Sequence, residues 1–359
     1  GLNPAKQQIV VAQNGERISR HQFQAQVMDV VRDVENAYWD LVFSIEDLEV
    51  TQKSLQLARD LLRNNRIQVE VGTMAPIDVL EAEAEVAARE EAVILAEEAI
   101  QRNEDLLKRL VNDPESEDFW SVRFKPVDQP TRSDVNIDLE AAVRIALQRR
   151  PVLSQSRVEL DTRSYNVRYT RNQVLPQVDL VGSLTFNGLG GDQIVRQGFA
   201  GEILREIPGG YSDALDQVFG GDFRDWTVAL NVSYPLGNSA ADAAYAQARV
   251  AYRQQRAQIN SQELLIAQEV RQAARQVETN RKRIDATRVA RELAQRRLEA
   301  EEKKFEVGMS TSFLIVQAQR DLAQAEANEL RAVIDYNKAL VAFERARGTL
   351  LDKSNISVR

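Results

Sequence analysis

The sequence predicts a mainly α protein with a small β part, built from long antiparallel coiled-coil hairpins that occur twice. Three observations predict this class: apolar residues recur every seven positions over long stretches, the pattern returns 236 residues later, and two short segments alternate with period two. A heptad repeat sustained over many turns indicates helices packed along one seam. Alternation with period two indicates strands.

The first hairpin is predicted from two apolar seams on either side of Glu70-Val71-Gly72. These seams are formed by Val27, Val34, Leu41, Leu48, Leu55, Leu62 and Val69, and by Val79, Val86, Val93, Ile100 and Leu107. Glycine suits the backbone that leaves a helix, so the turn lies at Gly72. We expect Thr73 to cap the return helix and Pro76 to start it. We expect the first helix to begin at Ser19, after a break at Asn14-Gly15.

The second hairpin repeats the first. A shift of 236 residues places Glu70-Val71-Gly72 on Glu306-Val307-Gly308 without a gap. The shifted seams contain Val270, Val277, Ile284, Leu298, Phe305, Ile315, Leu322, Tyr336, Phe343 and Leu350. Arg291 and Glu329 interrupt them, and we expect the long stem of Arg291 to carry its charge out to solvent. The chain therefore contains a duplicated half-protein.

Composition excludes several function classes. The 46 basic and 54 acidic residues give a net charge of −8, which argues against nucleic acid as a partner. The chain has no cysteine and one histidine, so we expect no metal site, no cofactor and no enzyme active site. No apolar run is long enough to cross a bilayer as a helix.

The middle of the chain leads from the helices to the strands. Residues 113–137, after the stop signal Asn112-Asp113-Pro114, are expected to form an irregular collar segment with one short strand. Two helices are expected next, from Asp138 to Arg149 and from Pro151 to Leu175.

Two strands are predicted at Gln177–Asn187 and Asp225–Tyr234. Each has one apolar face, which is formed by Val178, Leu180, Gly182, Leu184 and Phe186 in the first strand and by Trp226, Val228, Leu230, Val232 and Tyr234 in the second. A strand of about ten residues can cross a bilayer when tilted, and aromatic residues mark the interfaces. This pattern favours a transmembrane hairpin over a soluble hairpin with one face on a core. The glycine-rich residues 188–224 are typical of an outward loop.

The second long hairpin is expected to run from Ala240 to Glu306 and from Ser312 to Thr349, with Gly348 near its end. Together these pieces resemble the TolC-like outer-membrane efflux proteins. The resemblance is carried by Arg150-Pro151-Val152-Leu153, by Leu175-Pro176-Gln177-Val178-Asp179-Leu180, by Tyr234-Pro235-Leu236, by the Val-Gly turns and by the duplication. It covers nearly the whole chain.

The resemblance implies a homotrimer in the outer membrane of a Gram-negative-type bacterium. A β-barrel would cross the membrane and continue into an α-barrel across the periplasm. The trimer would be the passive exit duct of a tripartite efflux or type I secretion system, working with a periplasmic adaptor (membrane fusion) protein and an inner-membrane pump. The family's first strand pair is expected to be missing, which leaves half the strands that the family uses.

The same resemblance predicts five segments. Residues 1–112 and 237–352 would be the periplasmic hairpins, and residues 113–175 the equatorial collar with the helix leading to the barrel. Residues 176–236 would be the barrel part, and 353–359 a tail.

The candidate site residues fall into three groups. The resemblance implies that the turns dock the adaptor through Val71, Gly72, Thr73, Val307, Gly308 and Met309, whereas a glycine that simply ends a helix needs no partner. Asp78 and Glu81 resemble an acidic ring at the periplasmic aperture, although acids in a first turn also complement the helix dipole. Trp226, Tyr234 and Phe186 form the expected membrane girdle of aromatic residues, in contact with outer-membrane lipid.

The main alternative is a soluble periplasmic coiled-coil scaffold or adaptor. The two functions differ at Trp226 and Tyr234, which a channel exposes to lipid and a scaffold buries in its own core.

Overall fold

The computed structural model describes residues 4–113, 115–116, 119–130, 135–199, 201–234, 237 and 240–358. They form two compact units. The strand unit comprises residues 1–11 and 161–254, and the helical unit comprises residues 12–160 and 255–359. Pro114, Pro235 and Leu236, which the sequence analysis used as signals, lie outside the described residues.

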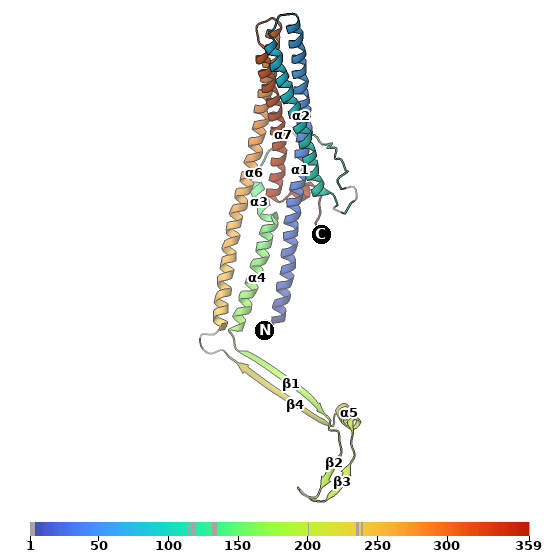
Figure 1. Cartoon of the computed structure of the whole chain (residues 1–359). Coiled ribbons are helices and arrows are strands. Elements are labelled where there is room, and N and C mark those ends of the chain that lie inside the picture. Colours follow the sequence, from blue (N-terminus) through green and yellow to red (C-terminus); the bar gives the residue numbers. More distant parts are fainter. Residues whose placement is uncertain are drawn as a thin grey trace. The chain divides into compact units, whose positions relative to one another are not determined.

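Two long helical hairpins dominate the chain. The first consists of α1 (Pro4–Glu70) and α2 (Pro76–Val111), and the second of α6 (Ala240–Glu306) and α7 (Ser312–Arg347). A shift of 236 residues places the bounds of α1 on those of α6, and the bounds of α2 on those of α7, which confirms the duplication. Both hairpin turns lie at the same end of the helical unit (Figure 1). Within the described part of the chain, no helix combines the length and apolar character that a membrane crossing requires.

The predicted start of the first helix was wrong. Helix α1 begins at Pro4 and continues through Asn14 and Gly15 without a break. Asn14 is buried, and Gly15 is exposed with open space around it. A glycine inside a helix costs only about 1 kcal/mol relative to alanine, which the packing of a long helix easily offsets.

The second pair of seams is confirmed by burial, and α7 is the most enclosed of the four long helices. Val270 and Tyr336 are fully buried, and Val277 and Phe343 nearly so. Fifteen of the 36 residues of α7 are buried, against seven of the 36 in α2. Between Ala332 and Ala346 the buried residues cover most of the circumference of α7, and only the side of Asp335, Lys338, Ala342 and Arg345 has none.

The predicted seams of the first hairpin are confirmed only in part, where Leu41 and Leu107 are buried together with Val34 and Ile100 packed against them. Leu41 and Leu55 are buried, but Val34, Leu48 and Leu62 are only half-buried. The most enclosed column of α1 lies three residues further along each heptad and consists of Ala37, Ser44, Ala58 and Asn65, with Thr51 half-buried. Small side chains can be enclosed by neighbouring helices more completely than large ones, so this column, and not the large apolar one, is the most buried side of α1.

Arg291 does not extend to solvent as expected, because it pairs with the other interruption of the seam. Its Nε donates to the Glu329 carboxylate across 2.5 Å, and only 9% of the Glu329 side chain is exposed. The first repeat has Leu55 and Val93 at these two positions. One repeat therefore closes its seam with an ion pair where the other uses apolar side chains.

The connector contains no strand in its described residues, 115–116, 119–130 and 135–138, so the predicted short strand was wrong there. It is held against the first hairpin instead. The Phe124 N–H donates to Glu104, the Lys108 ammonium donates to the Trp120 carbonyl, and the Tyr38 hydroxyl donates to Asp128.

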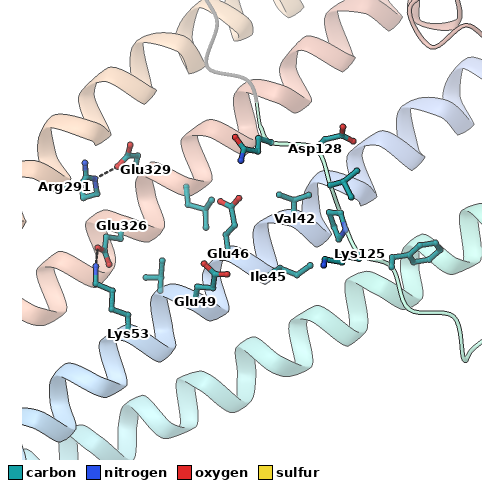
Figure 2. A pocket seen from close by; sticks show the side chains of 16 residues that line it. Val42, Ile45, Glu46, Glu49, Lys53, Lys125, Asp128, Arg291, Glu326 and Glu329 are labelled. Carbon is teal, nitrogen blue, oxygen red and sulfur yellow. Dashed lines mark hydrogen bonds and ion pairs between the residues drawn. The ribbon is translucent and has the colours of Figure 1, made fainter.

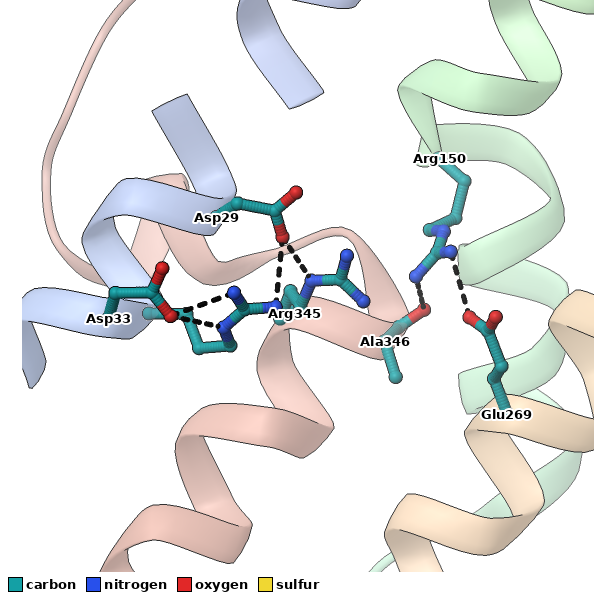
Figure 3. A network of polar contacts seen from close by, with 7 residues as sticks. Asp29, Asp33, Arg150, Glu269, Arg345 and Ala346 are labelled. Atoms are coloured by element: carbon teal, nitrogen blue, oxygen red, sulfur yellow. Dashed lines mark hydrogen bonds and ion pairs between the residues drawn. The ribbon is translucent and has the colours of Figure 1, made fainter. Parts of the chain in front are cut away.

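Helices α3 (Leu139–Arg149) and α4 (Pro151–Gln173) follow, and the Asp138 side chain caps α3 by accepting from the Glu140 and Ala141 N–H groups. The corner between them explains the Arg150-Pro151 motif. Arg150 is buried, donates to the Ala346 carbonyl and pairs with Glu269 of α6 at 2.8 Å (Figure 3). Burial lowers the pKa of this guanidinium. Arg345, one residue earlier on α7, pairs with Asp29 of α1 at 2.7 Å. The end of α7 is thus fixed on both sides, and the short α8 (Leu350–Lys353) follows it.

The strand unit contains the predicted hairpin. Strands β1 (Gln177–Asn187) and β4 (Phe223–Ser233) pair antiparallel, with Leu180 opposite Leu230. The segment between them is not a plain loop. It contains β2 (Gln193–Arg196), β3 (Ile203–Ile207) and the helix α5 (Tyr211–Gly220), which the sequence analysis did not predict.

The pair Arg291–Glu329 gives the first testable prediction. Arg291→Leu removes the partner of a nearly buried carboxylate and should lower the free energy of unfolding by about 3 kcal/mol. The double variant Arg291→Leu/Glu329→Val, which copies Leu55 and Val93 of the first repeat, should return to within about 1 kcal/mol of the wild type or exceed it. Urea titrations of the purified protein measure both. Additive losses in the double variant would contradict the pairing.

Candidate functional site: the hairpin turns and the strand face

The two hairpin turns share one backbone design. Gly72 and Gly308 adopt left-handed φ angles of 77° and 74°. The residue after each glycine donates its N–H to a carbonyl five residues back, Thr73 to Gln68 at 2.8 Å and Met309 to Lys304 at 2.7 Å. This Schellman pattern satisfies the last carbonyls of α1 and α6 and reverses the chain abruptly.

The turns expose apolar side chains. Val71 is 67% exposed, Val307 is 69% exposed and Met309 is 77% exposed. Ile77, Leu80 and Phe313, in the first turns of the return helices, are also more than half exposed. Neither backbone closure nor helix capping requires apolar side chains at these positions. A cluster of this kind is typical of a surface that contacts another molecule.

The predicted cap of α2 was wrong, while the predicted role of Pro76 was confirmed. The Thr73 hydroxyl donates to the Gln68 carbonyl, so it stabilises the end of α1 and not the start of α2. The N-cap of α2 is Ala75, which has no capping side chain, and Pro76 occupies the first helical position. In the second repeat Thr311 does cap α7, by accepting from the Leu314 N–H.

A buried asparagine ties the two turns together. Asn65 of α1 is completely buried and donates both to the Asp78 carbonyl of α2 and to the Ser312 hydroxyl of α7. The bond to Ser312 measures 2.7 Å. The start of α2 and the start of α7 therefore share one polar anchor.

The candidate acidic residues lie close to this anchor. Asp78 is half-buried in the first turn of α2, and Glu81 is exposed one turn further on. Three positions apart on a helix, they lie on the same side of α2. Their placement is compatible with both an aperture ring and simple stabilisation of the helix N-terminus.

An ionic cluster joins the two hairpins further along. The Glu85 carboxylate of α2, only 5% exposed, accepts hydrogen bonds from Arg89 of the same helix and from Arg320 of α7. Arg89 also donates to the Ser54 carbonyl and hydroxyl of α1. Burial raises the pKa of Glu85, but the hydrogen bonds from Arg320 and Arg89 outweigh it and hold the pKa below its ordinary value.

A groove of about 820 Å³ lies beside the connector, between α1 and α7 (Figure 2). Ion pairs cross it: Lys53 of α1 reaches Glu326 of α7 at 2.8 Å, and Arg291 reaches Glu329. Its other walls include Glu46, Glu49 and the connector residues 124–129. The pairs of Lys53 and Arg291 join the helices, and the described residues contain no group of acidic or histidine side chains arranged to hold a metal ion.

The apolar face of the β1–β4 hairpin is fully open. In the observed register Val178 lies opposite Val232, Leu180 opposite Leu230 and Leu184 opposite Trp226, so the apolar residues of both strands share one face. Trp226 is 74% exposed, Tyr234 57% and Phe186 44%. The alternative of a soluble scaffold required Trp226 and Tyr234 in a core, and the described residues place neither in one.

The whole chain is similar to outer-membrane proteins. The family model described as outer membrane efflux protein matches residues 6–113 and 142–349. The chain belongs to the outer membrane efflux protein family. It is 21% identical to outer membrane protein TolC of Vibrio cholerae over 347 residues, which are 97% of this chain and 74% of that protein.

Solved structures of this kind share the fold of this efflux protein. The outer-membrane channel OprN matches with a TM-score of 0.77 and 18% identity, over 96% of this chain and 71% of that one. VceC from Vibrio cholerae matches with a TM-score of 0.75 and 16% identity, over 96% and 75%. The efflux protein is therefore an outer-membrane channel with a large periplasmic part, and it serves as an exit duct for a pump. Trimeric assembly follows from family membership.

Sequence reasoning located both turns but missed the residues that join them. Asn65 and Ser312 lie 247 positions apart, and Glu85 and Arg320 lie 235 apart. The one available signal for Asn65 was its place in the seven-residue column of small side chains. Arg89 follows Glu85 by four residues, which is a local signal for a pair on one helix face, but the distant partner Arg320 gave none.

Acid should weaken the joint between the hairpins of this efflux protein. A carboxyl group whose pKa is depressed on folding adds stability above its ordinary pKa of 4.5 and loses that contribution as the pH falls through the folded value. Glu85→Gln should therefore lower the free energy of unfolding by about 2 kcal/mol at pH 7, and this difference from the wild type should vanish in acid below that range.

Thermal unfolding followed by circular dichroism at several pH values measures the effect. Glu90→Gln is the matched control: Glu90 lies on the same helix as Glu85, but its pair with Arg59 of α1 is about half exposed, so the substitution should change stability by less than about 1 kcal/mol. An equal effect of the two substitutions at pH 7 would contradict the role of the cluster.

Proposed function

We propose that three copies of this chain form a passive duct in which each segment has a separate task. The β1–β4 hairpin (within residues 176–236) crosses the outer membrane and faces lipid. The long hairpins (within 1–112 and 237–352) enclose the periplasmic passage, with residues 113–175 as a collar around it. The chain carries out no catalysis of its own, and an inner-membrane pump delivers the substrate.

The observation that carries this proposal is the open apolar face of the hairpin. Both strands have 11 residues, the length that a tilted strand needs to cross a bilayer. Trp226 and Tyr234 lie eight residues apart at opposite ends of this face, about 26 Å along the strand. Aromatic residues at both ends of an apolar band are typical of barrels in the outer membrane.

The turns are the proposed contact with the periplasmic adaptor. Exposed Val71, Val307 and Met309 give an apolar surface on a backbone that hydrogen bonds hold rigidly. Because Asn65 connects the two turns, the adaptor would meet one continuous surface in each subunit. Asp78 and Glu81 are the proposed acidic ring of the aperture, where negative charge from three subunits would favour cations.

Charge on the strand face tests the membrane crossing. Leu180→Arg places a cation near the middle of the apolar face and should destabilise the trimer in lipid vesicles by about 2–4 kcal/mol. Ser183→Arg, on the opposite face of the same strand, is the matched control and should change stability by less than about 1 kcal/mol. Urea-induced unfolding in vesicles measures both, and equal losses would refute the lipid-facing assignment.

Charge at the turns tests the docking surface. Val307→Asp/Met309→Asp should abolish co-purification with the adaptor of the same pump and should raise drug sensitivity in cells, because a desolvated carboxylate opposes an apolar contact. Val289→Asp, at an exposed apolar residue of α6 far along the helix from the turn, should leave both unchanged. Undiminished adaptor binding by the turn variant would show that docking occurs elsewhere.

A further inference from the structure

Helix α5 is a separately capped element between β1 and β4. The Asp213 carboxylate accepts from the Gly210 N–H at the start of the helix. At its other end Gly221 adopts a left-handed φ of 70° and donates its N–H to the Gln217 carbonyl. Figure 1 shows α5 at the end of the β1–β4 hairpin. Since β1 follows α4 and β4 precedes α6, this end is opposite the one that joins the long helices.

Close backbone contact fixes α5 to the end of β1. A Cβ atom at Gly188 would lie 2.0 Å from the Ala214 carbonyl oxygen, so only glycine permits this approach. The Leu189 N–H donates to the Gln217 side chain at 2.9 Å. Gly221 lies beside the Phe186 ring, with 3.5 Å between Phe186 Cε1 and the position of an added Cβ.

These contacts place α5 on the apolar face of the hairpin. Phe186 belongs to that face, and its ring lies beside Gly221 at the end of α5. Residues two apart in an extended chain point to the same side, so a side chain at Gly188 would point to the side of Phe186, and Ala214 of α5 occupies that space. The helix therefore lies just beyond Phe186 and Trp226, where the face ends. Neighbouring subunits of a closed sheet add to strand edges, so a second copy of the chain would leave this face uncovered.

The two flanks of α5 differ in polarity. Tyr211, Leu215 and Phe219 recur every four residues and are 80%, 37% and 86% exposed. Residues four apart share a helix side, so these three form one apolar flank. The other flank carries Asp213 and Asp216, while Ala214, Gln217 and Val218 face β1.

We propose that α5 is an interfacial helix that rests on the outer surface of the bilayer beside the barrel wall. Tyr211, Leu215 and Phe219 insert into the boundary between headgroups and acyl chains, and Asp213 and Asp216 face water. The proposal rests on the membrane crossing of β1 and β4, because the lipid surface of α5 continues their apolar face. An amphipathic helix with one aromatic edge is suited to this position.

Fluorescence quenching by lipids with brominated acyl chains tests the proposal in reconstituted trimers. The chain has three tryptophans, Trp39, Trp120 and Trp226. With Trp39→Phe and Trp120→Phe, the remaining Trp226 reports on the hairpin. Adding Trp226→Phe and Phe219→Trp moves the reporter to the apolar flank of α5, and Asp216→Trp in the same background is the matched control.

We expect brominated lipid to reduce the emission of the Phe219→Trp reporter to the same extent as that of Trp226, while the Asp216→Trp reporter keeps its emission. Equal emission loss, or none, at positions 219 and 216 would overturn the interfacial helix, as would shielding of position 219 from both brominated lipid and aqueous acrylamide. Unquenched Trp226 would instead refute the membrane crossing itself.

A second measurement covers the case in which a tryptophan variant fails to form trimers. The chain has no cysteine, so Phe219→Cys and Asp216→Cys accept single nitroxide labels. The label at position 219 should be relaxed more by oxygen, which concentrates in lipid, and the label at position 216 more by a water-soluble nickel chelate. The same relaxation pattern at both positions would overturn the proposal.

Discussion

The burial of α7 is the constraint on which the rest of the helical unit depends. A helix that is buried over most of its circumference needs neighbours on several sides, and each neighbour is held by its own contact. Arg320 connects α7 to α2, Arg345 connects it to α1, and the Ala346 carbonyl receives Arg150 from the corner of α3 and α4. The turns keep their positions because Asn65 connects them at the start of the same helix.

The duplication explains why the two hairpins have the same helix lengths, and ion pairs explain how they differ. The helices of the two hairpins have identical lengths, and their bounds coincide after the shift of 236, so apolar seams alone would let them pack in more than one way. The second repeat alone carries Arg291 and Glu329 on its seam, where the first has Leu55 and Val93. Because an unpaired buried charge is costly, the Arg291–Glu329 pair distinguishes the second hairpin from the first.

Much of the fold could be predicted because its signals are local and repeated. The ends of α2, α6 and α7 follow from proline, glycine and the heptad pattern, and β1 follows from its alternation. The start of α1 was missed because Asn14-Gly15 suggests a break, although a long packed helix tolerates one glycine. The small segment of β2, β3 and α5 was missed because glycines dominate it, and its α5 anchor depends on a contact between Gly188 and Ala214 that no periodicity reveals.

In the candidate site too, the features with local signals could be predicted and those that depend on distant contacts could not. Gly72 and Gly308 predicted both turns, because a left-handed residue at a helix end is a local requirement. The partners that hold the turns together are more than 230 positions apart in sequence, and polar residues such as Asn65 carry no apolar signal. The large apolar column was also not the most enclosed one, since Ala37, Ser44 and Ala58 are buried while Leu48 and Leu62 are half-buried.

Hydrogen exchange of backbone amides tests the central position of α7 most directly, because the duplication supplies an internal standard. Residues 332–343 of α7 correspond to residues 96–107 of α2 after the shift of 236. In the solubilised trimer, the amides of 332–343 should exchange more slowly than those of 96–107 and be among the slowest in the chain. Equal exchange of the two segments, or faster exchange in α7, would contradict the account.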